Sequence, residues 1–310
     1  MESLNRNAIE LVDEAIDFAG ELNVVVRELS SGATVLDFGV EADGGIEAGL
    51  LLTGIQTAGI ATVQTRMDTV GAATLPHVEV ATDHPGLALL CAQKAGWELT
   101  VGDFEGLGSG PARALVGEES EFERIGYYDE FDLTVLSVES DRLPDEAVAE
   151  AVADRAGVQD SGVFLPTYPT ASAVGSVTAA ARAAELATFR LSELGYDPTD
   201  VLSAAGSAPV APVAGDEATA VARTNDAIAY GGRAYLRVRE DFDRFEEVPS
   251  TAPEEYGEPF EAIFASADWD FEALDPAVFA PGAVTVDVEG GPTYALGETD
   301  EAVLAEAFGV

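Results

Sequence analysis

The chain has 310 residues and a formal net charge of −42, from 57 Asp and Glu against 15 Lys and Arg. This charge repels nucleic acids and anionic membranes. A single cysteine excludes an internal disulfide, and one cysteine with two histidines argues against a Cys/His zinc site. No stretch resembles a membrane span or a signal peptide. Because 47% of the residues are hydrophobic, we expect a folded, cytoplasmic protein from a high-salt organism rather than a disordered chain.

The first half of the chain predicts helices and strands in alternation. Apolar residues recur at helical spacing after Asn5, and apolar runs on both sides of Ser30–Gly32 predict a hairpin. The predicted elements are, in chain order, a helix over 6–22, a hairpin of 23–29 with 33–39, a buried helix over 44–64, a strand over 77–82, a helix over 85–96, a strand over 97–103, a helix beginning at 111, a strand over 131–140 and a helix over 144–157.

The second half predicts further elements of both kinds. In chain order they are a long helix over 169–197, a proline-rich loop over 207–221, a polar turn leading into apolar residues over 224–239, a hairpin and a helix over 300–309. Because the elements alternate without a strict strand–helix–strand period, we expect an α/β fold with mixed α+β sheets in two lobes. A change of composition between Ser140 and Asp145 predicts lobes over 1–142 and 143–310, which could exchange segments.

Stretches without acidic residues indicate where this chain is not simply solvated surface. Ser161–Ala184 has no Asp or Glu in 24 residues, where 24 × 57/310, about 4, would be expected. Similar windows cover 48–67, 84–97 and 106–117. In so acidic a chain, such windows predict core, subunit interface or binding cleft.

A glycine-rich turn runs over Gly106–Leu115. Its G-x-G-x-G spacing is not that of a dinucleotide-binding loop, and no lysine follows it as a Walker A loop requires. Pro111 suits the first turn of a helix capped by Ser109 or Gly110, and the free N–H groups at a helix start attract anions. The turn is either a structural connection or an anion site that includes Arg113.

The helix predicted over 169–197 carries one charged stripe among alanines and valines. Thr178, Arg182 and Glu185 are four and three residues apart and therefore share a helix face. A solvated ion pair of this spacing contributes only ~0.3–0.5 kcal/mol and normally has polar neighbours. Because those neighbours are missing, the stripe predicts a general base, Glu185, held by Arg182 in a cleft.

Two further short polar segments, which we call islands, each allow a structural and a functional interpretation. Asn225 and Asp226 precede an apolar run and a glycine pair, and Asp83 with His84 precedes a predicted helix. Asn and Asp at such positions commonly cap helices or form turns. Each island is therefore either a cap or part of a binding site.

Five blocks of the chain together resemble the methenyltetrahydromethanopterin cyclohydrolase family, in order and over nearly the whole length. They are 31–49 (SGATVLDFGVEADGGIEAG), 78–97 (VEVATDHPGLALLCAQKAGW), 108–115 (GSGPARAL), 169–197 (PTASAVGSV to LATFRLSELGYD) and 223–236 (RTNDAIAYGGRAYL). The resemblance implies a two-domain α/β subunit with a pocket between the domains, in a cytoplasmic homotrimer. It also implies hydrolysis of the N5,N10-methenyl bridge of a reduced pterin to the N5-formyl compound, with no redox cofactor and no metal.

The family's catalytic arginine and glutamate match Arg182 and Glu185, the pair already selected from the residues alone. By block match, the resemblance adds substrate-binding candidates, which are Gly108, Ser109, Gly110, Arg113, Asp83, Thr170, Ser172, Asn225 and Asp226. Tetrahydromethanopterin carries a phosphate, whereas this chain has few basic residues, so methenyl-tetrahydrofolate stays open as the substrate. A non-catalytic pterin-binding protein is the alternative from another class.

Overall fold

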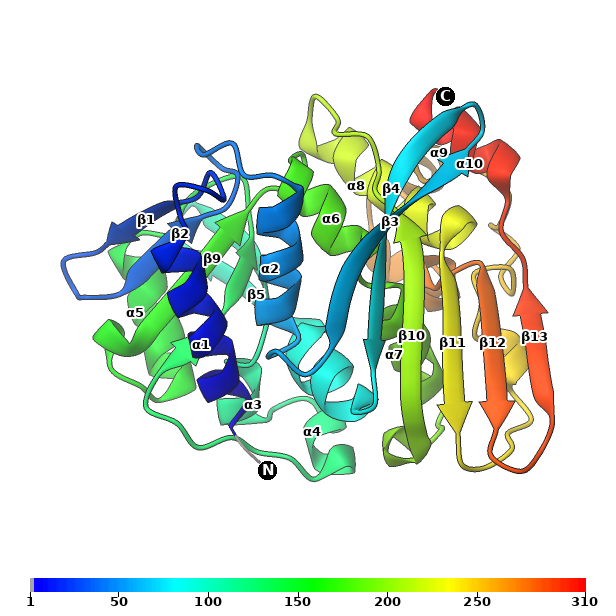
Figure 1. Ribbon diagram of the computed structural model, residues 1–310, viewed down its shortest axis with the longest axis horizontal. Coiled ribbons are helices and arrows are strands. Elements are labelled where there is room, and N and C mark those ends of the chain that lie inside the picture. Colours follow the sequence, from blue (N-terminus) through cyan, green and yellow to red (C-terminus); the bar gives the residue numbers. More distant parts are fainter. Residues whose placement is uncertain (1–2) are drawn as a thin grey trace. The chain divides into compact units, whose positions relative to one another are not determined.

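The computed structural model describes residues 3–310, in which contacts define two compact units (Figure 1). The first unit contains the residues up to Ala61 together with Gly86–Thr178, and the second contains Thr62–Pro85 with Ala179–Val310. Over the described residues, no helix combines the length and apolar character that crossing a membrane requires.

The first unit is built on a seven-stranded mixed sheet of order β1-β2-β9-β8-β6-β5, with β7 paired to β9. Its elements are α1 (Leu4–Asp17), β1 (Val25–Glu28), β2 (Thr34–Asp37), α2 (Ile46–Gln56), the π-helix η1 (Gly86–Gln93), β5 (Ala95–Val101), β6 (Phe104–Ser109), α3 (Arg113–Val116), α4 (Ser120–Ile125), β7 (Thr134–Val135), β8 (Ser137–Glu139), α5 (Glu146–Ala156), η2 (Asp160–Gly162), β9 (Val163–Tyr168) and most of α6 (Ala173–Ala180). The predicted β1–β2 hairpin is confirmed. Apolar residues of α1 and α2 form one core with β2, and α5 forms a second with β5, β8 and β9.

The second unit contains a six-stranded mixed sheet of order β13-β12-β11-β10-β4-β3. Its elements are β3 (Thr62–Val70), β4 (Ala73–Thr82), α7 (Ala183–Glu193), η3 (Pro198–Asp200), β10 (Val201–Pro209), α8 (Glu217–Gly231), β11 (Arg233–Val238), η4 (Phe245–Glu247), α9 (Phe260–Ser266), η5 (Phe271–Ala273), η6 (Pro276–Phe279), β12 (Ala283–Val288), β13 (Thr293–Gly297) and α10 (Glu301–Phe308). Because β11 pairs parallel to β12 but antiparallel to β10, the predicted mixed sheets are confirmed.

Strand pairing divides the chain differently from the expected lobes, 1–142 and 143–310. That boundary falls between β8 and α5, inside the first unit, because β9 pairs in parallel with β2 and β8. The β3–β4 hairpin belongs to the second unit because β4 pairs with β10. Both pairings join residues that lie far apart in the sequence.

Several predicted boundaries shift where a turn or a strand interrupts the apolar pattern. The helix predicted over 44–64 ends at Gln56, because Ala58 and Gly59 adopt positive φ angles and β3 follows at Thr62. The helix predicted over 169–197 is broken into α6 and α7. The polar segment 223–232, for which a cap or a turn was the structural interpretation, instead continues α8, whose cap is Asp216.

Candidate active site

The break between α6 and α7 sets the position of the predicted catalytic pair. Arg182 is the residue that precedes α7, with its N–H bonded to the Ala179 carbonyl at 3.0 Å. The start of α7 rests directly on β10, because a Cβ added at Gly206 would lie 2.4 Å from the Ala184 nitrogen. The absence of a side chain at Gly206 therefore lets the helix hold Glu185 close to the strand.

Arg182 and Glu185 form the ion pair that the sequence predicts. Arg182 Nε donates to Glu185 Oε2 at 2.9 Å, and the side chains are 23% and 1% exposed. Withdrawing a carboxylate from water costs several kcal/mol, and one guanidinium seldom repays that cost in full. A buried carboxylate beside a partly exposed arginine thus lowers the stability of the fold, and its environment suits proton transfer.

Thr178 shares the sequence spacing of the pair but not its role. Its hydroxyl donates to the carbonyl oxygens of Val174 and Gly175, at 3.0 and 3.1 Å, within α6. Such local bonding is common for threonine inside helices. Of the predicted stripe, Arg182 and Glu185 thus contact each other, whereas Thr178 bonds only within its own helix.

Arg113 has a structural role, in contrast to the anion site that the glycine turn suggested. Its side chain is fully buried, and its guanidinium binds Glu119 at 2.9 Å through Nε. It also donates to the carbonyls of Leu90 and Lys94 at the end of η1, at 3.2 and 2.7 Å. With these partners and no exposure, Arg113 stabilises the end of the π-helix and does not present a cation to solvent.

The glycines of the same turn are strand and connection residues. Gly106 and Gly108 lie in β6, where a Cβ on Gly108 would come within 3.1 Å of Leu136 and Trp97, so glycine allows these side chains to pack closely against the strand. Gly110 has a φ of +109° and donates to the Ala92 carbonyl. No long helix follows, since α3 has only four residues.

A buried polar cluster in the first unit was missed at the sequence level. Gln56 Nε2 lies within hydrogen-bond distance of the oxygens of Ser109, Ser137 and Tyr168, at 3.0 to 3.2 Å. These residues come from α2, β6, β8 and β9, so only tertiary structure brings them together. Ser109 thus contributes through its side chain rather than as a helix cap.

Thr170 and Ser172 lie between β9 and α6. Thr170 donates to Glu139, and the Ser172 hydroxyl donates to the Pro169 carbonyl at 2.8 Å while accepting from Gly175 N at 2.9 Å. Ser172 therefore caps the first turn of α6, a sufficient structural reason for its presence.

The remaining candidates lie in the second unit with Arg182 and Glu185. Asp83 is exposed, and its neighbour His84 donates through its backbone to Thr82. Asn225 donates to the Val221 carbonyl at 2.8 Å within α8. Asp226 is 2% exposed and accepts from Phe260 N at 2.8 Å, at the start of α9.

Burial raises the pKa of Asp226 to about 7, although the hydrogen bond from Phe260 N acts in the opposite direction. The polar residues expected to form a turn are therefore interior residues of α8, and Asp226 links that helix to α9. Among residues 3–310, no group of three or more His, Cys, Asp and Glu could hold a metal ion.

Similarity to known proteins defines the class to which the chain belongs and identifies several relatives within that class. Residues 3–308 match the family model described as Cyclohydrolase (MCH), so the chain belongs to this cyclohydrolase family. The methenyltetrahydromethanopterin cyclohydrolase of Halobacterium salinarum is 63% identical over 310 residues, covering 100% of both chains. Those of Methanothermobacter thermautotrophicus and Methanocaldococcus jannaschii are each 41% identical, covering 100% of this chain and at least 99% of theirs.

Proposed function

We propose that this chain is a hydrolase that opens the N5,N10-methenyl bridge of methenyltetrahydromethanopterin, giving the N5-formyl compound and a proton. The observation that carries this assignment is the full-length similarity to methenyltetrahydromethanopterin cyclohydrolases, at 63% identity for the halobacterial protein. The buried Glu185 carboxylate and the partly exposed Arg182 beside it fit the chemistry that the reaction needs.

The methenyl carbon is electrophilic because it belongs to an amidinium-like cation. Glu185 takes one proton from water as the water oxygen bonds to this carbon, which yields a neutral carbinolamine. Glu185 then returns its proton to N10 as the carbon–N10 bond breaks. The carbinolamine hydroxyl loses its own proton as the formyl C=O forms, so one proton is released overall.

Arg182 has two roles in this scheme. Its Nε holds the Glu185 carboxylate at 2.9 Å, which fixes the base before water attacks. Because the guanidinium is partly exposed, we assign it a second role, to stabilise charge that develops on the water-derived oxygen of the carbinolamine. One water molecule and these two side chains account for every bond and proton in the proposed scheme, which therefore uses no cofactor and no metal.

The substrate-binding residues belong to the same proposal. Direct roles fit Asp83, which is exposed, Thr170, which lies in the connection between β9 and α6, and Asn225, which is half-buried on α8. Gly108, Gly110, Arg113, Ser172 and Asp226 would act by shaping the elements that carry the site. We place the reaction in one-carbon metabolism of a high-salt cytoplasm, in a homo-oligomer, for which the resemblance implies a trimer.

The decisive assay follows the loss of methenyl absorbance in molar KCl with methenyltetrahydromethanopterin and methenyl-tetrahydrofolate in parallel. Faster turnover of the methanopterin compound supports the proposal, and a clear preference for the folate moves the activity to that carrier. Binding of either compound without turnover would identify a non-catalytic pterin-binding protein.

A further inference from the structure

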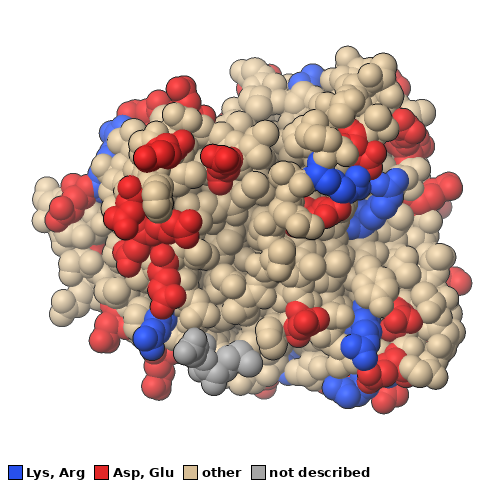
Figure 2. Space-filling view, in the orientation of Figure 1, with Lys and Arg blue, Asp and Glu red and all other residues tan. Residues whose placement is uncertain are grey.

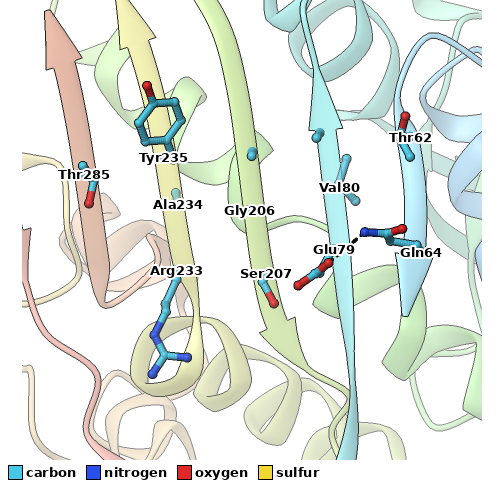
Figure 3. Close-up of a pocket in the computed structure, with 12 residues that line it drawn as sticks. Thr62, Gln64, Glu79, Val80, Gly206, Ser207, Arg233, Ala234, Tyr235 and Thr285 are labelled. Carbon is cyan, nitrogen blue, oxygen red and sulfur yellow. Dashed lines mark hydrogen bonds between the residues drawn. The ribbon is translucent and has the colours of Figure 1, made fainter. Parts of the chain in front are cut away.

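The helix that carries Glu185 lies against β10, an interior strand of the second unit's sheet. α7 packs against β10 and β11, behind the strands in Figure 1. Because side chains alternate between the two sides of a strand, every second residue of β10 faces this helix. Gly206 is on that side, and Figure 3 shows it between Ala234 on β11 and Val80 on β4.

The residues next to Gly206 on the helix side of the sheet are apolar. Two belong to β10 and two to the neighbouring strands, and all four are buried: Ala204, Ala208, Val80 and Ala234. Charged residues stand on the opposite side, where Glu79 and Arg233 flank Ser207 in the register. Figure 2, which views that side, shows acidic and basic atoms over the strands. At the level of Gly206, the sheet therefore meets α7 through packing and not through charged groups.

The contact at Gly206 is closer than a residue with a side chain allows. A Cβ at this position would lie 2.4 Å from the Ala184 nitrogen, 2.9 Å from the Ala184 Cα and 3.0 Å from the Ala183 carbonyl carbon. All three atoms belong to the backbone of the helix, so no side-chain rotation relieves the overlap. Since ordinary contacts begin at 3.4 Å, an alanine would require the helix and the strand to separate by about 1 Å.

Of the two elements, β10 is held more firmly at this level. It pairs with β11 at Ala234 and with β4 at Val80, in two antiparallel ladders. Moving the strand would disturb the hydrogen bonds of both ladders. The first turn of α7 has no such support, because the first N–H groups of a helix lack partners within the helix. We therefore expect the start of α7 to move when a side chain is added at Gly206.

A displacement of this turn moves the general base of the proposed reaction. Glu185 directly follows Ala184, and its almost completely buried carboxylate accepts the hydrogen bond from Arg182 Nε at 2.9 Å. Misplacing a catalytic group by about 1 Å can lower a rate on the order of 10²-fold. The overlap that an alanine would create is of this size.

We propose that Gly206 is a positioning residue for the reaction. Because it has no side chain, it sets the depth at which α7 rests on β10, and thereby the place of the Glu185 carboxylate. Gly206 acts only through the backbone of the helix and supplies no chemistry of its own. This inference rests on the proposed function, since it takes Glu185 to be the general base.

The test compares two glycine-to-alanine substitutions in the second unit. Gly206→Ala introduces the overlap beneath α7. Gly282→Ala is the matched control, because its Cβ would lie 2.5 Å from the Ala229 carbonyl oxygen, an overlap of similar size against α8. Both should lower the melting temperature. In molar KCl, below both melting temperatures, we expect Gly206→Ala to reduce kcat about 10²-fold and Gly282→Ala to change it less than about threefold.

A double variant separates positioning from general damage to the fold. If Gly206→Ala acts through the Glu185 carboxylate, it has no further effect once that group is unable to accept a proton. The kcat of Gly206→Ala combined with Glu185→Gln should therefore equal that of Glu185→Gln alone within about twofold. General damage would instead multiply the two losses.

The outcomes decide the role of Gly206, with circular dichroism to show that each variant is folded. Low kcat in Gly206→Ala, near-normal kcat in Gly282→Ala and no further loss in the double variant support the proposal. Wild-type kcat in folded Gly206→Ala, or multiplied losses in the double variant, overturns it. If Gly206→Ala does not fold, Ala204→Val replaces it, since Ala204 is the next residue of β10 on the helix side. Wild-type kcat in that folded variant overturns the proposal in the same way.

The same measurements distinguish this inference from the proposed function. A wild-type chain that does not turn over the methenyl compound overturns the proposed function, and the role of Gly206 with it. An active wild type with a strongly impaired Glu185→Gln and an unaffected Gly206→Ala counts only against positioning by Gly206.

Discussion

Arg182 Nε lies 2.9 Å from Glu185 Oε2, and the carboxylate that accepts this hydrogen bond is almost completely buried. The same helix carries a second pair at the same spacing, Arg190 and Glu193, whose closest atoms are 3.7 Å apart and whose carboxylate is 34% exposed. The two pairs differ in burial and hydrogen-bond geometry, and only the first has the environment of a catalytic carboxylate.

This contrast provides a matched experiment on the general base. Glu185→Gln keeps the size of the side chain but removes its ability to accept a proton, so kcat should fall on the order of 10²–10⁴-fold. Glu193→Gln should leave kcat within about twofold, since surface ion pairs contribute little. Steady-state kinetics in molar KCl measure both, and near-normal turnover by Glu185→Gln would remove Glu185 from the mechanism.

Arg113 should affect stability and not substrate affinity. Arg113→Ala leaves Glu119 partly buried without its guanidinium and frees the carbonyls at the end of η1, so the free energy of unfolding should fall by ~3–5 kcal/mol. The KM of the remaining folded enzyme should not change. Denaturant unfolding and kinetics below the melting temperature check both, and a large rise in KM with unchanged stability would return Arg113 to the substrate site.

Asp226 should make stability depend on pH in one direction. Burial raises its pKa from 3.8 to about 7 in the folded state, so between these values the folded chain holds a proton that the unfolded chain has released. The contribution of Asp226 to the free energy of unfolding is therefore greatest below about pH 4. It falls as the pH rises towards 7, by up to roughly 4 kcal/mol.

Asp226→Asn should remove this contribution while retaining an oxygen that accepts from Phe260 N. Unfolding free energies at several pH values between 5 and 8, with salt held constant, compare the two proteins. Parallel pH profiles for wild type and variant would contradict the assigned role of Asp226.

The net charge of −42 should make the fold dependent on salt. Below roughly 1 M KCl the screening length grows and repulsion among acidic side chains increases, so the chain should dissociate or unfold. Circular dichroism and molar mass during stepwise dilution follow this change. Full activity after long incubation in dilute buffer would show that the charge is not an adaptation to high salt.

The sequence alone determined the features that depend on local spacing. Alternation of apolar runs predicted mixed sheets, the SSG turn predicted the first hairpin, and the interval between Arg182 and Glu185 predicted an ion pair. An interval of three residues places two side chains together in any helix turn, whatever the surrounding fold.

Only the tertiary structure decided which partners each polar residue meets. Arg113 follows a glycine turn that suggests an anion site, yet the carbonyls of η1 and Glu119 enclose it. Gly106 and Gly108 belong to a strand because Leu136 and Val138 pack against them, and the unit boundary follows from the pairing of β4 with β10 and of β9 with β2. Apart from the bond between Arg113 and Glu119, these contacts join residues that lie far apart in the chain, so they form only when the whole fold forms.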